Sequence, residues 1–325
     1  MRHQPNRAFP ITRRTLLGSA VVAATAPVIA TSAQTPASPD EIDFHARIDA
    51  LLAAMPASAM QDQGTFFYAD LAGQLSAAGV ERPSPSHTTR DVPNGYFQAT
   101  VALPLASRAF VSGLDPSWYP TFGFAPATLG QALMIDDLEG ALALFRGGFD
   151  ADDVRDALTA SGYEVAQRDH GEAFAIADDP DLETAVGRLT LGTMNHAIVR
   201  DDLLVFAGNE TRIDDVLAVL AGDAASMADA DRWPSLARLF SPDVVGMIPV
   251  PASALAFWSG ATPVATATTL IDMALGVRGG SRSEPLALGG EGTPQATPVG
   301  LAPQPAHIEA RLRYADETTA AREAD

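Results

Sequence analysis

Two amino acids, cysteine and lysine, are missing from this chain. Without cysteine it can form no disulfide bond, and it has no thiolate ligand for zinc, no thiol nucleophile and no cysteine for lipid attachment. Without lysine it has no phosphate-loop lysine, no Schiff-base chemistry and no Ser-x-x-Lys motif. These absences exclude several classes of enzyme and leave carboxylate, histidine and hydroxyl groups as candidates for catalysis.

Positive charge is also scarce. The 325 residues include 21 arginines against 40 acidic residues, which gives a formal net charge of −19 at pH 7. Four of the arginines lie in residues 1–33, so the rest of the chain carries 17 arginines against the same 40 acids. Because an acidic surface repels phosphate backbones, we expect no nucleic-acid partner. The hydrophobic share of 47% is still enough for a substantial core.

The N-terminus carries a recognisable export pattern. The segment Thr12–Leu17 (TRRTLL) places Arg13 and Arg14 before an apolar stretch over residues 17–30, and small residues up to Ala33 offer a cleavage site. Residues 1–33 therefore resemble a twin-arginine signal peptide. The resemblance implies that the chain crosses the cytoplasmic membrane already folded. We expect it in the periplasm, on the cell surface or outside the cell.

The same leader could serve as a membrane anchor if it were not cleaved. Its apolar stretch is short and rich in alanine, and Pro27 interrupts it. A stretch of this kind is too weak for a stable transmembrane helix. We therefore expect no stable transmembrane segment in the mature chain.

Composition divides the remainder into three parts. Residues 34–40 form a linker rich in Pro, Ser and Thr, and residues 41–135 form an N-terminal region of helices and a strand. Residues 136–325 form a central α+β domain that includes a flexible loop over 278–305, where glycine and proline are frequent. The expected elements of the N-terminal region are helices over 42–55 and 66–80, a strand over 96–103, and one or two helical turns over 127–133.

The central domain is built around residues 141–222, where the hydrophobic period changes repeatedly. An apolar run predicts a strand that ends at two glycines, and helical spacing follows it. Two pairs of short apolar runs, each joined by a tight turn, predict two hairpins. The elements expected here are a strand over 141–145, a helix over 150–161, a hairpin of 163–168 with 172–177, a hairpin of 197–200 with 203–207, and a helix over 212–221.

These elements predict an α+β fold with an antiparallel or mixed sheet. The two hairpins, the strand over 141–145 and further strands over 96–103 and 307–314 would make the sheet. We expect the helices over 150–161 and 212–221 to pack on one face of it. A duplicated ferredoxin-like arrangement of β-α-β units would fit the pattern.

No cofactor or metal motif emerges from the sequence. Five histidines follow the leader, and no two of them have the spacing of a helical metal pair. The segment Gly289–Gly292 (GGEG) resembles a phosphate loop only superficially, because prolines occupy the region where its helix should follow. The acidic segment Asp178–Glu183 lacks the glycine of a calcium loop and has Pro180 instead. We therefore expect neither a cofactor nor a metal.

The segment Phe110–Phe124 gathers aromatic residues among glycine and proline. It could form a ligand-binding loop. We favour a loop packed over the core, because aromatic side chains bury large areas where regular structure is missing.

Two functional hypotheses remain. The first is an exported, non-catalytic domain that binds a ligand, a partner or a component of the cell envelope, and we favour it because no catalytic constellation is visible. The alternative is a secreted hydrolase that uses scattered carboxylate or Ser/His/Asp residues. Its candidates are Asp136, Asp137, His170 and His196, and it requires a cleft that brings two of them together beside Phe110–Phe124.

Overall fold

The structure is a computed structural model. It describes residues 43–59, 66–83, 94–100, 103–105, 107–113, 115–135, 140–176, 181–230, 232–250, 270–278 and 308–314. The predicted signal peptide and the 34–40 linker lie outside these ranges, as does the 278–305 loop apart from Arg278, the last residue of a strand.

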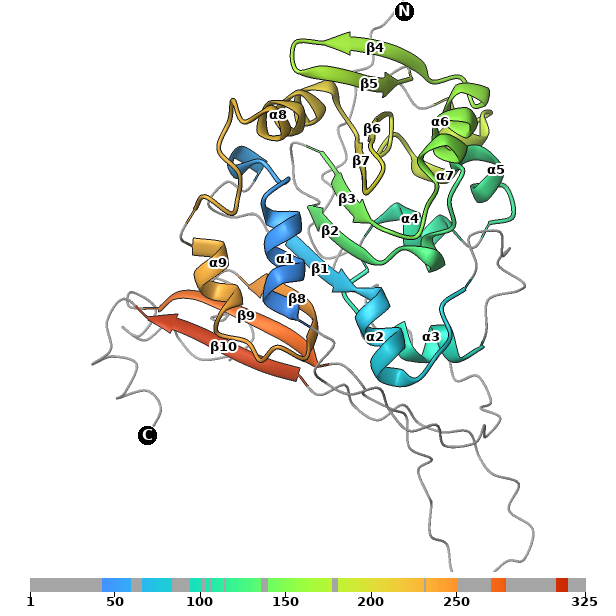
Figure 1. Ribbon diagram of the computed structural model, residues 1–325. Helices are drawn as coiled ribbons and strands as arrows, with labels where there is room; N and C mark the ends of the chain where they lie inside the picture. Colours follow the sequence, from blue (N-terminus) through green and yellow to red (C-terminus); the bar gives the residue numbers. More distant parts are fainter. Residues whose placement is uncertain are drawn as a thin grey trace, which may run out of the picture. The chain divides into compact units, whose positions relative to one another are not determined.

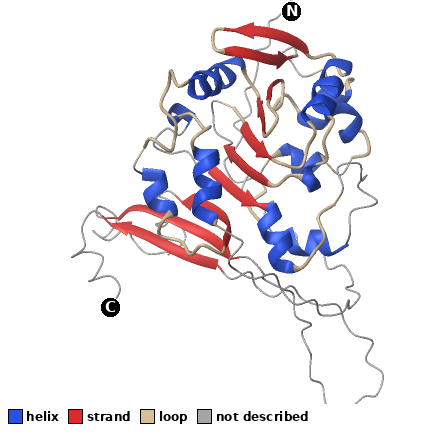
Figure 2. Ribbon diagram, in the orientation of Figure 1, coloured by secondary structure: helices blue, strands red, loops and turns tan. Residues whose placement is uncertain are grey.

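One sheet of ten strands runs through the described residues in the order β10-β9-β8-β1-β2-β3-β7-β6-β5-β4 (Figures 1 and 2). Every neighbouring pair of strands is antiparallel. The prediction of an α+β fold with an antiparallel sheet is therefore confirmed. The strands are β1 (Phe66–Asp70), β2 (Gln131–Ile135), β3 (Leu142–Arg146), β4 (Glu164–Arg168), β5 (Gly171–Ala175), β6 (His196–Val199), β7 (Leu203–Ala207), β8 (Val244–Val250), β9 (Leu270–Arg278) and β10 (Ile308–Tyr314).

Short helices connect these strands. The two longest described helices begin at side-chain caps, where Asp150 accepts hydrogen bonds from Asp152 N and Asp153 N, and Asn209 accepts one from Arg212 N. The helices are α1 (Phe44–Leu52), η3 (Ala57–Ala59), α2 (Leu71–Ala78), α3 (Asn94–Thr100), α4 (Arg108–Ser112), α5 (Trp118–Phe122), η5 (Pro126–Thr128), α6 (Ala151–Ala160), α7 (Ala185–Thr190), α8 (Glu210–Ala221) and α9 (Arg232–Ala237).

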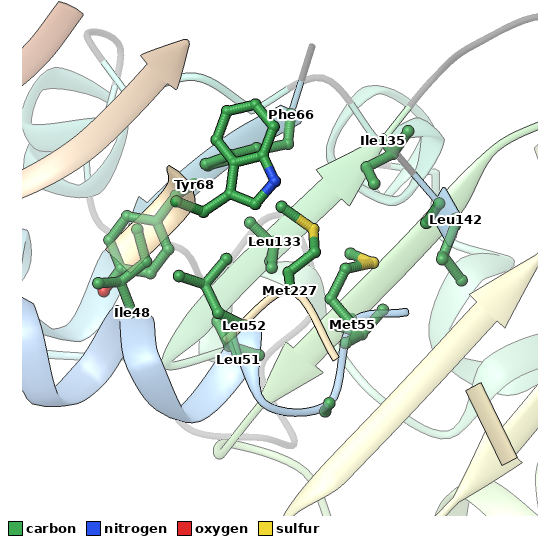
Figure 3. Packing of buried hydrophobic residues seen from close by; sticks show 14 of the residues in the cluster. Ile48, Leu51, Leu52, Met55, Phe66, Tyr68, Leu133, Ile135, Leu142 and Met227 are labelled. Atoms are coloured by element: carbon green, nitrogen blue, oxygen red, sulfur yellow. The ribbon is translucent and has the colours of Figure 1, made fainter. Parts of the chain in front are cut away.

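The sheet has a hydrophobic core on each face. Along β3, Leu142 and Leu144 contribute to the first core, while Ala143 and Phe145 contribute to the second, because successive side chains of a strand point to opposite faces. Helices α1, α8 and α9 cover the first core, part of which is shown in Figure 3. Helices α2 to α7 supply the second core.

The expectation that the helices over 150–161 and 212–221 share one face is wrong. Val154 of α6 lies in the second core, whereas Val216 of α8 lies in the first. The reason is visible in β7, whose five residues are all buried. A strand that is apolar on both sides needs helices over both faces of the sheet, and α6 lies on one face and α8 on the other.

The strand order also differs from a ferredoxin-like unit. Helix α6 joins β3 to β4, and these two strands run parallel because four antiparallel steps separate them. Three strands, β5, β6 and β7, lie between them. In a ferredoxin-like unit a single strand would lie there.

Most of the elements predicted for the central domain are confirmed: β3, α6, the β4–β5 hairpin, the β6–β7 hairpin, α8 and β10 all occur where the pattern places them. The strand expected over 96–103 is wrong, since Asn94–Thr100 is helical. Tyr96, Ala99 and Leu103 are buried while Phe97 is exposed, which is helical spacing. Thr100 Oγ1 also donates to Tyr96 O, one turn earlier.

The helix expected over 66–80 is half right. Its first five residues form β1 between β2 and β8, and only the part from Leu71 is helical. The turns expected over 127–133 are likewise a short η5 followed by β2. Strands β1 and β2 thus belong to the same sheet as β3, while the predicted domain boundary at residue 136 stays a prediction.

Candidate functional site

The histidines proposed for a hydrolase lie far apart. His170 occupies the turn between β4 and β5, where its Nδ1 lies 3.1 Å from Asp223 Oδ2. His196 is buried at the start of β6, opposite Ala175 at the other end of β5. Five residue steps along a strand separate the two positions by about 16 Å. The structure therefore does not bring His170 and His196 together, and Asp136 and Asp137 lie outside the described residues.

The other candidate ligands are also dispersed. No group of three or more His, Asp or Glu side chains that could hold a metal ion occurs within the described ranges. His45 Nε2 lies 3.2 Å from Phe240 O, a contact between α1 and the segment after α9. In the acidic segment, Asp181 Oδ1 accepts from Glu183 N at 2.9 Å and so shapes a turn, while residues 178–180 lie outside the described part.

The aromatic stretch belongs to the second core. Trp118, Phe122 and Phe124 are buried, and their rings contact one another. The Phe124 ring stacks on Phe206 of β7 at a centroid distance of 5.9 Å and meets Phe145 of β3 at 6.1 Å. The preference for a packed segment over a ligand-binding loop is therefore correct for these side chains.

A polar cluster that the sequence did not reveal lies at the end of β1. Asp70 is completely buried, and its Oδ1 accepts from Gly73 N at 2.8 Å, which caps α2. Its Oδ2 accepts from Arg47 of α1 at 2.6 Å. The signal available in the sequence was an aspartate directly after an apolar run and before a helix, which is also the signature of an ordinary N-cap.

Burial dominates the electrostatics of this cluster. It raises the pKa of the Asp70 carboxyl, while the hydrogen bond from Gly73 N, the charge and hydrogen bond of Arg47 and the charge of Arg82 lower it. Burial also raises the pKa of Tyr68, and the negative charge of Asp70 adds to that effect. Both oxygens of Asp70 are occupied by donors from α1 and α2, so the carboxylate ties these helices to β1.

Two exposed leucines flank α7 on the surface. Leu182 is 57% exposed and precedes the helix, and Leu191 is 50% exposed and follows it. Leu191 has a φ angle of 51°, the sole positive φ of a non-glycine residue within the described segments. We call Leu182, α7 and Leu191 the α7 surface.

No helix in the described part of the chain combines the length and apolar character needed to cross a membrane. Comparison of the chain with protein-family models, with curated proteins and with solved structures finds no match. Its function is therefore inferred from its own residues.

Proposed function

We propose that this chain is an exported domain that binds a macromolecular partner through the α7 surface. The observation that carries the proposal is Leu191, a leucine that is held in a left-handed conformation and still leaves half of its side chain in water. The twin-arginine pattern supports the location, since it implies a partner in the cell envelope or outside the cell.

The backbone at Leu191 is unfavourable for its side chain. A left-handed conformation costs an L-residue other than glycine about 1–2 kcal/mol, and glycine or asparagine usually occupies such a helix end. Leu191 N donates to Gly187 O at 2.8 Å in this conformation, so the end of α7 fixes it. Residues strained in this way cluster at functional sites, so the conformation of Leu191 favours a functional role for this position.

The exposure is equally unfavourable. Burying a leucine side chain gains about 1.5–3 kcal/mol, and Leu182 and Leu191 leave roughly half of that gain unused. Leu191 is the C-cap of α7, and Leu182 lies three residues before the first residue of the helix. The loop before α7 is anchored, since Gly187 leaves no room for a side chain against Asp181 O. A partner that covers α7 would gain apolar contact with each leucine that it reaches.

Site-specific cross-linking tests this proposal. A photoreactive residue is placed at position 191 or 182 in the full chain, and the cross-linked products are compared after irradiation of intact cells. We expect one discrete product from both positions. Position 239 is the control, because Leu239 is an exposed leucine in another part of the chain, after α9. The proposal is wrong if 182 and 191 give no product beyond those from 239.

A second variant separates strain from recognition. Leu191→Asn keeps the left-handed conformation at lower cost and removes the apolar side chain. We expect it to raise the melting temperature while abolishing the cross-link from position 182. A fall in melting temperature with the cross-link unchanged would assign Leu191 to folding instead.

The hydrolase alternative has less support. Its two histidines lie at opposite ends of β5, and no described observation favours a reaction over binding.

A further inference from the structure

Strand β4 ends the sheet in the described part of the chain, and its outer backbone groups can be identified. Asp169 and His170 form a two-residue turn, so the flanking Arg168 and Gly171 are a hydrogen-bonded pair. Hydrogen-bonded and non-hydrogen-bonded pairs alternate along an antiparallel ladder. Val165 and Gln167 therefore direct their N–H and C=O groups away from β5 and toward the edge.

The sequence of β4 is complementary to itself in the antiparallel direction. If a two-fold axis passes beside Ala166, Val165 of one copy faces Gln167 of the other. The symmetry produces this pair twice, once on each side of Ala166. Each such pair exchanges two backbone hydrogen bonds, because both residues point their groups outward. On the other face of the strand, Glu164 of one copy lies opposite Arg168 of the other. The direction of the backbone hydrogen-bonding groups and the charges of the side chains thus favour the same register.

We infer that a second copy of this chain pairs with β4 in this register, and that the two sheets become one continuous sheet across the axis. This surface is separate from the α7 surface and involves different residues. The interface is isologous, since each copy offers the same five residues.

The exposure of β4 suits this arrangement. Val165 is 54% exposed, although it lies on the same face of the sheet as Phe174 of the second core. Glu164 and Gln167 are also exposed. In the paired strands, Val165 of each copy lies directly opposite Gln167 of the other copy, whose aliphatic part can cover it. The interface therefore covers an apolar side chain that the single copy leaves in water.

Arg168 can pair with a carboxylate from each of the two copies. Its guanidinium pairs with Glu210 of α8, and the side chain is 15% exposed. A guanidinium carries five N–H donors, so it can hold a second carboxylate beside the first. Glu164 of the second copy would supply that carboxylate.

Three of the features that block edge pairing, namely lysine, proline and a bulge, are missing from β4. Natural edge strands often carry lysine, proline or a bulge. The five residues of β4 include neither lysine nor proline, and the register with β5 is continuous. The two charges that β4 does carry have opposite signs and attract in the two-fold register.

The absence of cysteine allows a direct test of the register. A non-hydrogen-bonded antiparallel pair places its Cα atoms about 4.5 Å apart, which lies within the range that a disulfide spans. In the full chain, Ala166→Cys should therefore form a disulfide-linked dimer under mild oxidation. Asp201→Cys is the matched control, because this side chain is 99% exposed in the β6–β7 turn. Equal cross-linking of the two variants would overturn the inference.

Sedimentation velocity tests the association without a covalent bond. We expect the unmodified chain to show a concentration-dependent dimer. Val165→Pro removes an outward N–H but no bond to β5, so it should yield a folded monomer. The measurement extends to a protein concentration of about 100 μM, about 100-fold above a Kd of about 1 μM for specific association. A chain that is still monomeric at that concentration would overturn the inference. Persistence of the dimer in Val165→Pro would do the same.

A charge exchange then tests the pairing of Glu164 with Arg168. Glu164→Arg and Arg168→Glu should each weaken the homodimer, since each sets like charges opposite one another. An equal mixture of the two variants sets opposite charges at both positions and should restore a heterodimer. Circular dichroism verifies that each variant is folded. Failure of the folded variants to associate on mixing would contradict the register.

Discussion

Arg47 of α1 and Asp70 at the end of β1 form an ion pair of 2.6 Å, in which the carboxylate is completely buried and the guanidinium side chain is one-third exposed. The pair joins a helix over the first core to the strand that precedes α2. Among the charged residues in the described ranges, Asp70 is the least exposed.

Replacing Arg47 with methionine should raise the pKa of Asp70 further, since the arginine lowers that pKa while burial raises it. A raised folded-state pKa favours the protonated carboxyl in the folded protein. The associated stability is therefore present below the unfolded pKa of about 3.9 and is lost as the pH rises through the folded pKa. The variant should lose stability over a wider pH window than the unmodified chain.

Carbon-detected NMR titration of the Asp70 carboxyl and thermal unfolding at several pH values check this expectation. Arg155→Met is the control, because Arg155 pairs with the exposed Asp152. Such surface pairs contribute about 0–1 kcal/mol. An unchanged Asp70 pKa in Arg47→Met would contradict the assigned role of the arginine.

Tyr163→Phe should destabilise the fold by about 1–3 kcal/mol, because a buried acceptor loses its donor. The Tyr163 hydroxyl donates to Met194 O at 2.5 Å, and burial raises the pKa of this tyrosine. Urea unfolding measures the loss. Tyr119→Phe serves for comparison, since Tyr119 is only partly buried, and an equal loss in both variants would argue against a special role for the buried hydroxyl.

Phe124→Ala should cost about 3–5 kcal/mol, as expected for truncation of a fully buried aromatic side chain. Phe124 contacts Trp118, Phe122, Phe145 and Phe206. Phe97→Ala is the control, because Phe97 is exposed on α3 and should change stability by less than about 1 kcal/mol. If the aromatic stretch were a ligand-binding loop, Phe124→Ala would leave the melting temperature almost unchanged.

The export route gives a prediction of a different kind. Replacing Arg13 and Arg14 together with lysine should retain the protein in the cytoplasm, because the twin-arginine pathway recognises the arginine pair. Cell fractionation followed by immunoblotting measures the distribution, and N-terminal sequencing of the exported form tests cleavage after Ala33. Unchanged export of the double variant would show that this pathway does not carry the protein.

Local signals explain why the central unit was predictable. Asp150 caps α6, Gly162 ends it with a φ of 92°, and Gly171 closes the β4–β5 turn with a φ of 144°. These residues act within a few positions of themselves, so their effect can be read without knowing what packs nearby.

Long-range contacts explain what was missed. β1 is a strand because β2 and β8 pair with it, although β8 follows about 170 residues later. Over the seven residues of α3 a helical and a strand period both fit, and packing against α2 decides between them, with Gln74 donating to Ala99 O at 2.6 Å. The division of α6 and α8 between two faces likewise depends on the whole sheet.

The same limit applies to the candidate site. Because glycine usually takes the left-handed position at the end of a helix, the sequence would place that position at Gly192. In the structure, Leu191 is the first residue after α7 with a positive φ. Nothing in the sequence marks that leucine as exposed. The self-complementary order of Glu164 and Arg168 was readable, but its meaning depends on β4 lying at the edge of the described sheet.

The first core also determines when α1 can complete its packing during synthesis. The Phe44 ring packs edge-on against Phe240 at 6.1 Å, and Phe44 N donates to Pro242 O at 3.1 Å, so α1 waits for partners that follow about 200 residues later. At about 5–20 residues per second, a ribosome needs roughly 10–40 s to make that intervening chain. Throughout that interval Phe44 can reach Tyr68 of β1, at 5.6 Å in the folded chain, but the part of α1 that Phe240 covers stays exposed, and a chaperone that binds nascent chains could bind it there.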